Sequence, residues 1–222
     1  MKSSHIVSTA AVVLVAWATS GAGAEFRGVA VGRNTSAAIT AHGEIVTSTH
    51  GGEWVQRETG VSFALHGITF ANGQFVAVGN EGAILTSTDG IKWTQQFSTT
   101  DERLRSVTWG KDCFVAVGYN GTIVVSRDGT HWSPRQAGTN ERLTGVAFGG
   151  GTFVAVGWNG VILSSKSGKG WTRQGRPADT KFVAVNYSGS QFTAVTELGD
   201  ELDSFDGSNW RRMPQLLTSA RN

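Results

Sequence analysis

The sequence predicts an all-β fold, a five-bladed β-propeller with four-stranded blades, from a repeat of constant length and the local pattern inside it. One tryptophan recurs five times at intervals of 39 residues, as Trp54, Trp93, Trp132, Trp171 and Trp210. Two sets of glycines keep the same interval. The repeats therefore occupy residues 26–64, 65–103, 104–142, 143–181 and 182–220, without insertion or deletion. A period close to 40 is typical of propeller blades or of helical arrays.

The pattern within one repeat favours strands over helices. The second repeat has four short segments of β-branched or aromatic residues, bounded by Gly, Asn or Asp, at 65–70, 75–78, 84–87 and 92–95. No window shows apolar residues spaced by three and four, as a helix would need. Four short strands with glycine turns make one propeller blade. One inward position of the first strand is β-branched in every repeat: Val29, Ile68, Val107, Val146 and Val185.

The two terminal repeats are the most divergent. Ser36 replaces the Phe of the inner repeats, and Glu201 replaces the Ile found at that position in all the others. Because repeats 1 and 5 meet in a closed ring, we expect this divergence to collect at one seam. Both repeats begin with a first strand and end with a fourth, so closure is expected to depend on blade packing alone.

The first 24 residues have the order of a secretory signal. The single cation Lys2 precedes an apolar run at 10–18, and small residues end at Ala24. That run is too short for a membrane span, and no later stretch approaches the required length. We expect cleavage after Ala24, one propeller domain at 25–222, and a secreted or periplasmic protein.

Charge and cysteine content exclude several classes. Lys and Arg total 19 against 17 Asp and Glu, and no basic run suited to nucleic acid is present. The single cysteine, Cys113, rules out an intramolecular disulfide and a Cys-rich zinc site. We expect Cys113 to be exposed in a turn, on a chain that is monomeric unless this thiol forms a disulfide dimer. No cofactor motif and no metal-ligand spacing are visible.

The segment between the third and fourth strands carries a motif with Ser, Asp, Gly and Trp in order. It includes Ser87, Asp89 and Trp93 in repeat 2, Ser126, Asp128 and Trp132 in repeat 3, and Ser204, Asp206 and Trp210 in repeat 5. An Asp can accept backbone N–H groups in a turn, and Trp can wedge between sheets.

The motif resembles the Asp box of bacterial neuraminidase repeats, found in sialidases, sialidase-like secreted propellers and photosystem assembly factors. The likeness covers the whole chain after residue 24 and implies a propeller in which these boxes are structural and lie away from the ligand face. Two departures are that Asp and Trp are one residue closer than in the family pattern, and that His50 and Ser167 replace the Asp in repeats 1 and 4.

An aromatic pair is the first candidate for a ligand site. The turns between second and third strands differ among repeats on a constant frame, which favours one asymmetric site over five identical ones. Tyr119 with Asn120, and Trp158 with Asn159, occupy these turns in adjacent repeats. Rings and amides suit a sugar or a peptide. The alternative is that both rings pack against the links between blades.

A cationic arc is the second candidate. Arg103, Arg142 and Lys181 share one register, immediately before the first strands of repeats 3, 4 and 5. Together they would bind a carboxylate or an acidic protein loop. We expect these cations to form one binding face with Tyr119 and Trp158, on the side of the propeller opposite the Asp boxes. The alternative is solvated surface charge, since Glu102 and Glu141 neighbour the arginines.

Acidic residues gather in repeat 5, namely Glu197, Asp200, Glu201, Asp203 and Asp206. They could ligate calcium, or simply face solvent. Tyr119 and Tyr187 lack the carboxylate partner that a sialidase-like mechanism requires. We therefore predict a non-catalytic propeller that binds a protein partner or a glycan, with an exo-glycosidase and a calcium-supported lectin as the alternatives.

Overall fold

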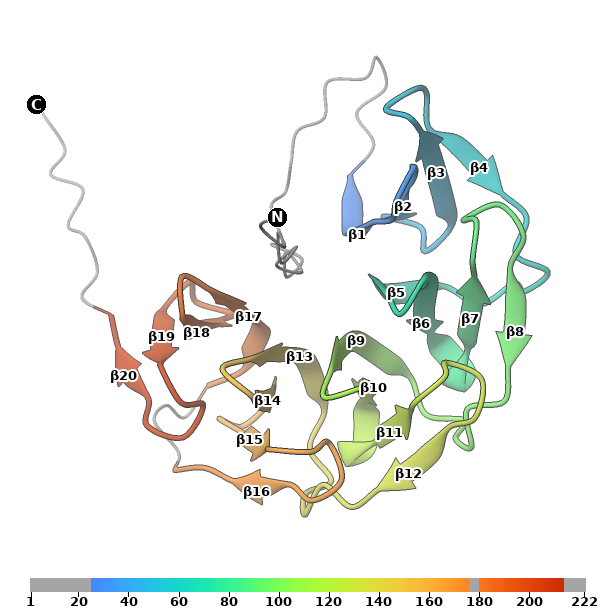
Figure 1. Cartoon of the computed structure of the whole chain (residues 1–222). Coiled ribbons are helices and arrows are strands. Elements are labelled where there is room, and N and C mark those ends of the chain that lie inside the picture. Colours follow the sequence, from blue (N-terminus) through green and yellow to red (C-terminus); the bar gives the residue numbers. More distant parts are fainter. Residues whose placement is uncertain (1–24, 176–179, 214–222) are drawn as a thin grey trace, which may run out of the picture.

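The computed structural model describes residues 25–175 and 180–213, so the expected signal segment at 1–24 lies outside the described residues. Consecutive strands form five four-stranded antiparallel sheets, each a simple meander (Figure 1). The predicted fold class, a propeller with five blades of four strands, is confirmed.

The strands follow the predicted repeats closely. Blade 1 comprises β1 (Phe26–Val31), β2 (Thr35–Thr40), β3 (Ile45–Thr49) and β4 (Val55–Arg57). Blade 2 comprises β5 (Leu65–Ala71), β6 (Gln74–Gly79), the 3₁₀ turn η1 (Asn80–Gly82), β7 (Ile84–Ser87) and β8 (Thr94–Gln96). Blade 3 comprises β9 (Leu104–Gly110), β10 (Cys113–Gly118), η2 (Tyr119–Gly121), β11 (Ile123–Ser126) and β12 (Ser133–Arg135). Blade 4 comprises β13 (Leu143–Gly149), β14 (Thr152–Gly157), β15 (Ile162–Ser165) and β16 (Thr172–Arg173). Blade 5 comprises β17 (Phe182–Ser188), β18 (Gln191–Thr196), β19 (Glu201–Ser204) and β20 (Arg211–Arg212).

The core consists of four similar interfaces between neighbouring blades. Between blades 2 and 3, Val76 and Val78 of β6 pack on Phe114 and the repeat tryptophan Trp132, all at most 5% exposed. The Phe114 and Trp132 ring centroids lie 6.3 Å apart, and the equivalent pair recurs in blades 2, 4 and 5. In blade 1, where Ser36 replaces the phenylalanine, Trp54 packs on Phe26 instead. Four of the tryptophans thus lie at equivalent places between sheets, and Trp54 of blade 1 does not.

The five blades lie along an arc whose two ends do not meet (Figure 1). First strands pack together in the order β1, β5, β9, β13 and β17. No comparable packing joins β17 back to β1 among residues 25–175 and 180–213. The closure between blades 1 and 5 that we expected is therefore absent from the described part of the chain.

The outer face of blade 5 is polar where the matching faces of inner blades are apolar. Val154 and Ile162 of blade 4 are fully buried against blade 5, whereas Thr193 and Glu201 occupy the equivalent positions of blade 5. Asp203 accepts hydrogen bonds from Thr193 Oγ1 at 2.9 Å and from Gln191 Nε2 at 3.0 Å. The Glu201 side of repeat 5 is thus built as the polar end of a repeat array.

Our expectation that Cys113 is exposed is wrong. It opens β10, is 5% exposed and belongs to the cluster between blades 3 and 4. Burial raises the pKa of its thiol, which makes the reactive thiolate scarcer. An intermolecular disulfide through Cys113 would require this interface to open.

Candidate functional site

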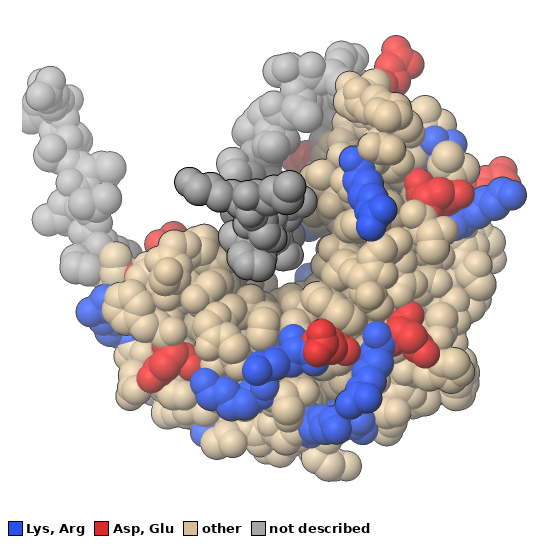
Figure 2. Space-filling view, viewed as in Figure 1, with Lys and Arg blue, Asp and Glu red and all other residues tan. Residues whose placement is uncertain are grey.

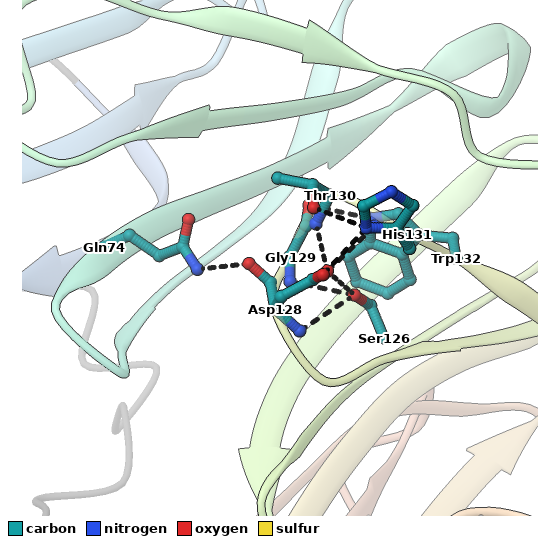
Figure 3. A network of polar contacts seen from close by, with 7 residues as sticks. All are labelled: Gln74, Ser126, Asp128, Gly129, Thr130, His131 and Trp132. Carbon is teal, nitrogen blue, oxygen red and sulfur yellow. Dashed lines mark hydrogen bonds and ion pairs between the residues drawn. The ribbon is translucent and has the colours of Figure 1, made fainter.

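The turns between third and fourth strands are fixed by their own side chains. In blade 3, Asp128 Oδ1 accepts the backbone N–H groups of Thr130 and His131, both at 2.8 Å (Figure 3). Ser126 Oγ accepts the N–H of Gly129 at 2.8 Å, and Trp132 Nε1 donates to the Gly129 carbonyl at 2.9 Å. Blades 2 and 5 repeat these bonds around Asp89 and Asp206. We call these three segments the SxDG turns.

The bonds to the Asp side chains have an electrostatic signature. Backbone N–H groups lower the pKa values of Asp89, Asp128 and Asp206, because they favour the charged carboxylate. In blade 4, Ser167 replaces the Asp and accepts one longer bond, at 3.3 Å, from the Lys169 N–H. The bonds made by Ser165 and Trp171 remain in that blade. All of these contacts serve the turn itself.

An SxDG turn is also bridged from the preceding blade. Gln74 Nε2 donates to the Asp128 carbonyl at 2.7 Å, across the interface between blades 2 and 3 (Figure 3). One repeat later, Cys113 Sγ lies 3.9 Å from the carbonyl oxygen of Ser167. In blades 2 and 3 the residue that begins the second strand therefore reaches the next blade, which explains why Cys113 is buried.

The opposite face carries the turns between second and third strands, because turns alternate sides along a meander. In blades 2, 3 and 4, each of these turns is fixed by backbone bonds to two links between blades. The Tyr119 N–H donates to the Arg103 carbonyl at 2.9 Å, and the Gly121 N–H donates to the Glu141 carbonyl at 2.8 Å. Equivalent bonds hold the turns of blades 2 and 4. Since backbone atoms fix this frame, its side chains are free to differ.

Five predicted residues form one ladder on this face, in which cations and rings alternate. The Arg103 guanidinium carbon lies 5.0 Å from the Tyr119 ring centroid. The Arg142 guanidinium carbon lies 4.5 Å from the Tyr119 ring and 4.2 Å from the Trp158 ring. Lys181 Nζ completes the series at 5.0 Å from Trp158. The aromatic and cationic candidates are thus one surface, which we call the ladder, spanning blades 3 to 5.

The two arginines of the ladder have no carboxylate partner in the described part of the chain, whereas the lysine has one. Lys181 forms an ion pair with Glu197 at 3.1 Å, and both side chains are about two-fifths exposed. Arg103 donates to the Tyr119 hydroxyl at 3.3 Å. Neither Arg103 nor Arg142 forms an ion pair within the described ranges. Glu102, which we considered as a neutralising neighbour, instead accepts from Asn120 Nδ2 at 3.4 Å.

The two asparagines have a conformational reason to occupy their turns. Asn120 and Asn159 have φ values of 52° and 53°, and Glu81 has 53° at the same position in blade 2. Asn adopts this left-handed region more readily than most residues. Both asparagines are exposed beside the ladder.

The acidic group of blade 5 does not converge. Asp203 is buried with its own hydrogen bonds, Asp200 forms an ion pair with Arg212, and Asp206 lies in its SxDG turn. Within the described residues, no group of three or more His, Cys, Asp or Glu could hold a metal ion.

Three further side chains at the same end of the blades were not selected by the sequence analysis. Arg27, His66 and Arg105 occupy the second position of the first strand in blades 1, 2 and 3. A comparison of the second residue of the first strand across the five repeats would have revealed them. That residue is basic in blades 1, 2 and 3, but Thr144 in blade 4 and Val183 in blade 5.

Charge on the other face is mixed. Figure 2 has the same viewpoint as Figure 1, and the face towards the viewer carries the turns between β9 and β10 and between β11 and β12. Lysines, arginines and acidic residues lie interspersed there. The ladder lies on the opposite face of the arc.

Comparison with known proteins identifies the fold. No family model matches the chain, and no curated protein matches it. YCF48 bound to D1 peptide superposes with a TM-score of 0.64 at 15% identity, over 83% of this chain and 65% of that one. The Nidogen/Laminin complex gives 0.66 at 14%, over 84% and 77%, and the WD40 β-propeller domain of Doa1 gives 0.68 at 11%, over 88% and 69%.

The likeness is one of architecture. Each of these identities is far below the level at which function transfers, so the superpositions show a β-propeller and nothing finer. The chain spans just under two thirds of the YCF48 chain that it matches. In the described part of the chain, no helix is long and apolar enough to cross a membrane.

Proposed function

We propose that this protein is an exported, non-catalytic propeller that binds an acidic segment of a protein partner on the ladder. One observation carries the proposal: Arg142 stacks between two rings, at 4.5 and 4.2 Å from their centroids, without a carboxylate partner in the described chain. Stacking holds the guanidinium plane while its N–H groups remain available for a carboxylate.

Preorganisation makes the ladder suited to binding. A free arginine loses side-chain entropy when it orders on a ligand, and stacking reduces that loss. Arg103, Arg142 and Lys181 derive from three successive links, so an extended segment could contact them in turn. Two or three acidic residues on such a segment would match the row. The similar solved structures include YCF48 with D1 peptide and the Nidogen/Laminin complex, which support a protein ligand by analogy alone.

A glycan is the second candidate, and the ladder disfavours it. Sugars stack on open aromatic faces. Tyr119 and Trp158 each have two cations within about 5 Å of the ring centroid, so their faces are occupied. The proposal of an acidic protein segment therefore stands ahead of the glycan.

The test is a binding assay on three arrays: acidic peptides, the same peptides with Lys replacing Asp and Glu, and glycans. We expect binding to acidic peptides alone, and weaker binding as salt rises, because exposed charges are screened over about 10 Å at 0.1 M. Arg142→Gln should abolish the signal, while Arg173→Gln, on the exposed outer strand β16, should leave it unchanged. Glycan binding that survives Arg142→Gln would overturn the proposal.

A further inference from the structure

A β-bulge recurs at the start of the first strand in all five blades. The pairing registers shift between Phe26 and Gly28 in blade 1 and between Leu65 and Gly67 in blade 2. The equivalent shift occurs in the other three blades. In each blade the extra residue is the second of the first strand. Bulges re-aim a side chain away from the regular alternation of a strand, so this position is set apart in every blade.

The bulged residues divide the arc into two parts. Blades 1, 2 and 3 have Arg27, His66 and Arg105 at this position, whereas blades 4 and 5 have the uncharged Thr144 and Val183. The fold requires none of these side chains, since all five blades make the same bulge with different residues. The three basic groups therefore have a reason other than blade geometry.

Close packing of the first strands brings these groups together. A Cβ at Gly67 would lie 3.0 Å from the Arg105 carbonyl oxygen, which shows how near β5 runs to β9. Arg27 Nη1 lies 3.1 Å from His66 Nδ1, across the interface between blades 1 and 2. Arginine can only donate, so Nδ1 accepts, and the ring is the neutral tautomer with its proton on Nε2. That Nε2–H donates to Asn80 Oδ1 at 2.6 Å.

The cluster holds positive charge with no counter-charge. Burial, then Arg103 and Arg27, lower the pKa of Arg105, and Tyr119 is the one group that opposes them. Burial, Arg105, Arg103 and Arg27 lower the pKa of His66, and the hydrogen bond that His66 donates to Asn80 opposes them. None of Arg27, Arg103 and Arg105 pairs with a carboxylate in residues 25–175 and 180–213. Two of the three bulged residues, His66 and Arg105, are half-buried, and like charges brought together there destabilise the protein unless an anion joins them.

We propose that Arg27, His66 and Arg105 form a binding site for a small oxyanion, a carboxylate or a sulfate-like group, beside the ladder and with no residue in common with it. The two arginines offer N–H groups from neighbouring blades on either side of His66. This site has no residue in common with the ladder and no aromatic stacking, and it lies in blades 1 to 3, so the two surfaces meet in blade 3. An acidic segment on the ladder could end here, but the site needs no such segment to bind an anion.

Binding at this site depends on pH through His66. An anion favours the imidazolium, which then donates from both nitrogens. Protonated Nδ1 can no longer accept from Arg27, so the Arg27 side chain is released towards the anion. The charged groups around the ring are all cations, from β1 and from the link and strand of β9, and they oppose protonation until the anion arrives. Binding therefore takes up a proton, and affinity rises as pH falls.

Sulfate is the first probe, because its charge stays constant from about pH 8 to about pH 5.5, the range in which histidine titrates. We expect sulfate affinity, measured by calorimetry at constant ionic strength, to rise roughly fivefold or more over that range, since one pKa unit is a factor of ten. An NMR titration of the His66 imidazole should show a higher pKa with sulfate than without it. This second measurement needs no variant.

Variants locate the site. Arg105→Gln should weaken sulfate binding roughly tenfold or more, the factor that about 1.4 kcal/mol represents. His66→Gln should keep binding but remove its pH dependence, and Arg173→Gln should change neither. Succinate replaces sulfate in a second series, and binding of succinate alone would identify the ligand class as carboxylate.

The proposal would be overturned if Arg105→Gln and wild type had equal affinities for sulfate and also for succinate, or if the pKa of His66 were unchanged in saturating sulfate and succinate. Failure of the acidic-peptide array alone would count against the ladder and not against this site.

Discussion

The two faces of the arc fix their turns in different ways. On one face, side chains make the bonds: Ser126, Asp128 and Trp132 each contact the backbone of their own turn, and blades 2 and 5 repeat the pattern. On the other face, backbone N–H groups and carbonyls make the repeated bonds, as between Tyr119 and Arg103. A side chain committed to its own turn cannot change without loss. Where backbone atoms fix the turns, the side chains can differ between blades, and the ladder lies on that face.

Blade 4 shows which side-chain bonds of these turns remain when the Asp is absent. Ser167 replaces Asp, yet Ser165 still accepts the Gly168 N–H at 2.9 Å, and Trp171 still donates to the Gly168 carbonyl at 3.1 Å. The Ser and Trp contacts thus survive loss of the carboxylate. We infer that Trp contributes most to stability, Asp less, and the ladder least, an order that four predictions test.

Trp132→Ala should have the largest effect. Its ring is 5% exposed and packs among Val76, Val78 and Phe114 between blades 2 and 3. Removing a buried aromatic side chain leaves a cavity, so we expect a loss of about 3–5 kcal/mol in the free energy of unfolding. Denaturant unfolding measures it. A loss under about 1 kcal/mol would contradict the wedge role.

Asp128→Ala should have the next largest effect. It removes the acceptor for two backbone N–H groups, as loss of a helix N-cap does, so we expect a loss of about 0.5–2 kcal/mol. The matched control is Ser167→Ala in blade 4, which loses one bond of 3.3 Å and should cost less. If both variants lost the same stability, the carboxylate would have no special role.

The pH dependence of stability should be smaller still, because the carboxylates are exposed. Folding lowers the pKa values of Asp89, Asp128 and Asp206 below their ordinary value of 3.8. A group whose pKa is lowered in the folded state contributes stability above its unfolded pKa and loses it as pH falls towards the folded value. We therefore expect the three Asp→Ala changes combined to cost less at about pH 2 than at about pH 7. A cost independent of pH would assign the effect to packing.

Much of the difference between the two faces could be predicted from the sequence, because repeats of constant length can be aligned with one another. The constant spacing of Trp54 to Trp210 placed every blade, and the shared register of Arg103, Arg142 and Lys181 placed the cations. What the register could not reveal is that the turns carrying Tyr119 and Trp158 interleave with those links. The sequence therefore predicted one binding face for all five side chains, but not the alternating contacts of cations and rings that the coordinates show.

Three features lay beyond the sequence for physical reasons. Curvature depends on the angle between sheets, which small packing differences set, so the open arc did not follow from five blades. Cys113 is buried because its turn reaches the next blade, a contact that local pattern cannot show. The bulges that single out Arg27, His66 and Arg105 are pairing irregularities, and a strand pattern of period two does not reveal them.

Arg142→Gln should have the smallest effect on stability and the largest on binding. Exposed cation–π contacts contribute about 0.5–1 kcal/mol each, and the Gln side chain retains part of the contact with Tyr119 and Trp158, so the melting temperature should change little. Acidic-peptide affinity should fall at least tenfold, since about 1.4 kcal/mol of a charge-assisted contact is lost. Asp128→Ala, on the opposite face, should lower the melting temperature and leave affinity unchanged at temperatures where the variant is folded. Calorimetry and peptide binding on both variants decide the matter, and the reverse pattern would move the binding surface to the face of the SxDG turns.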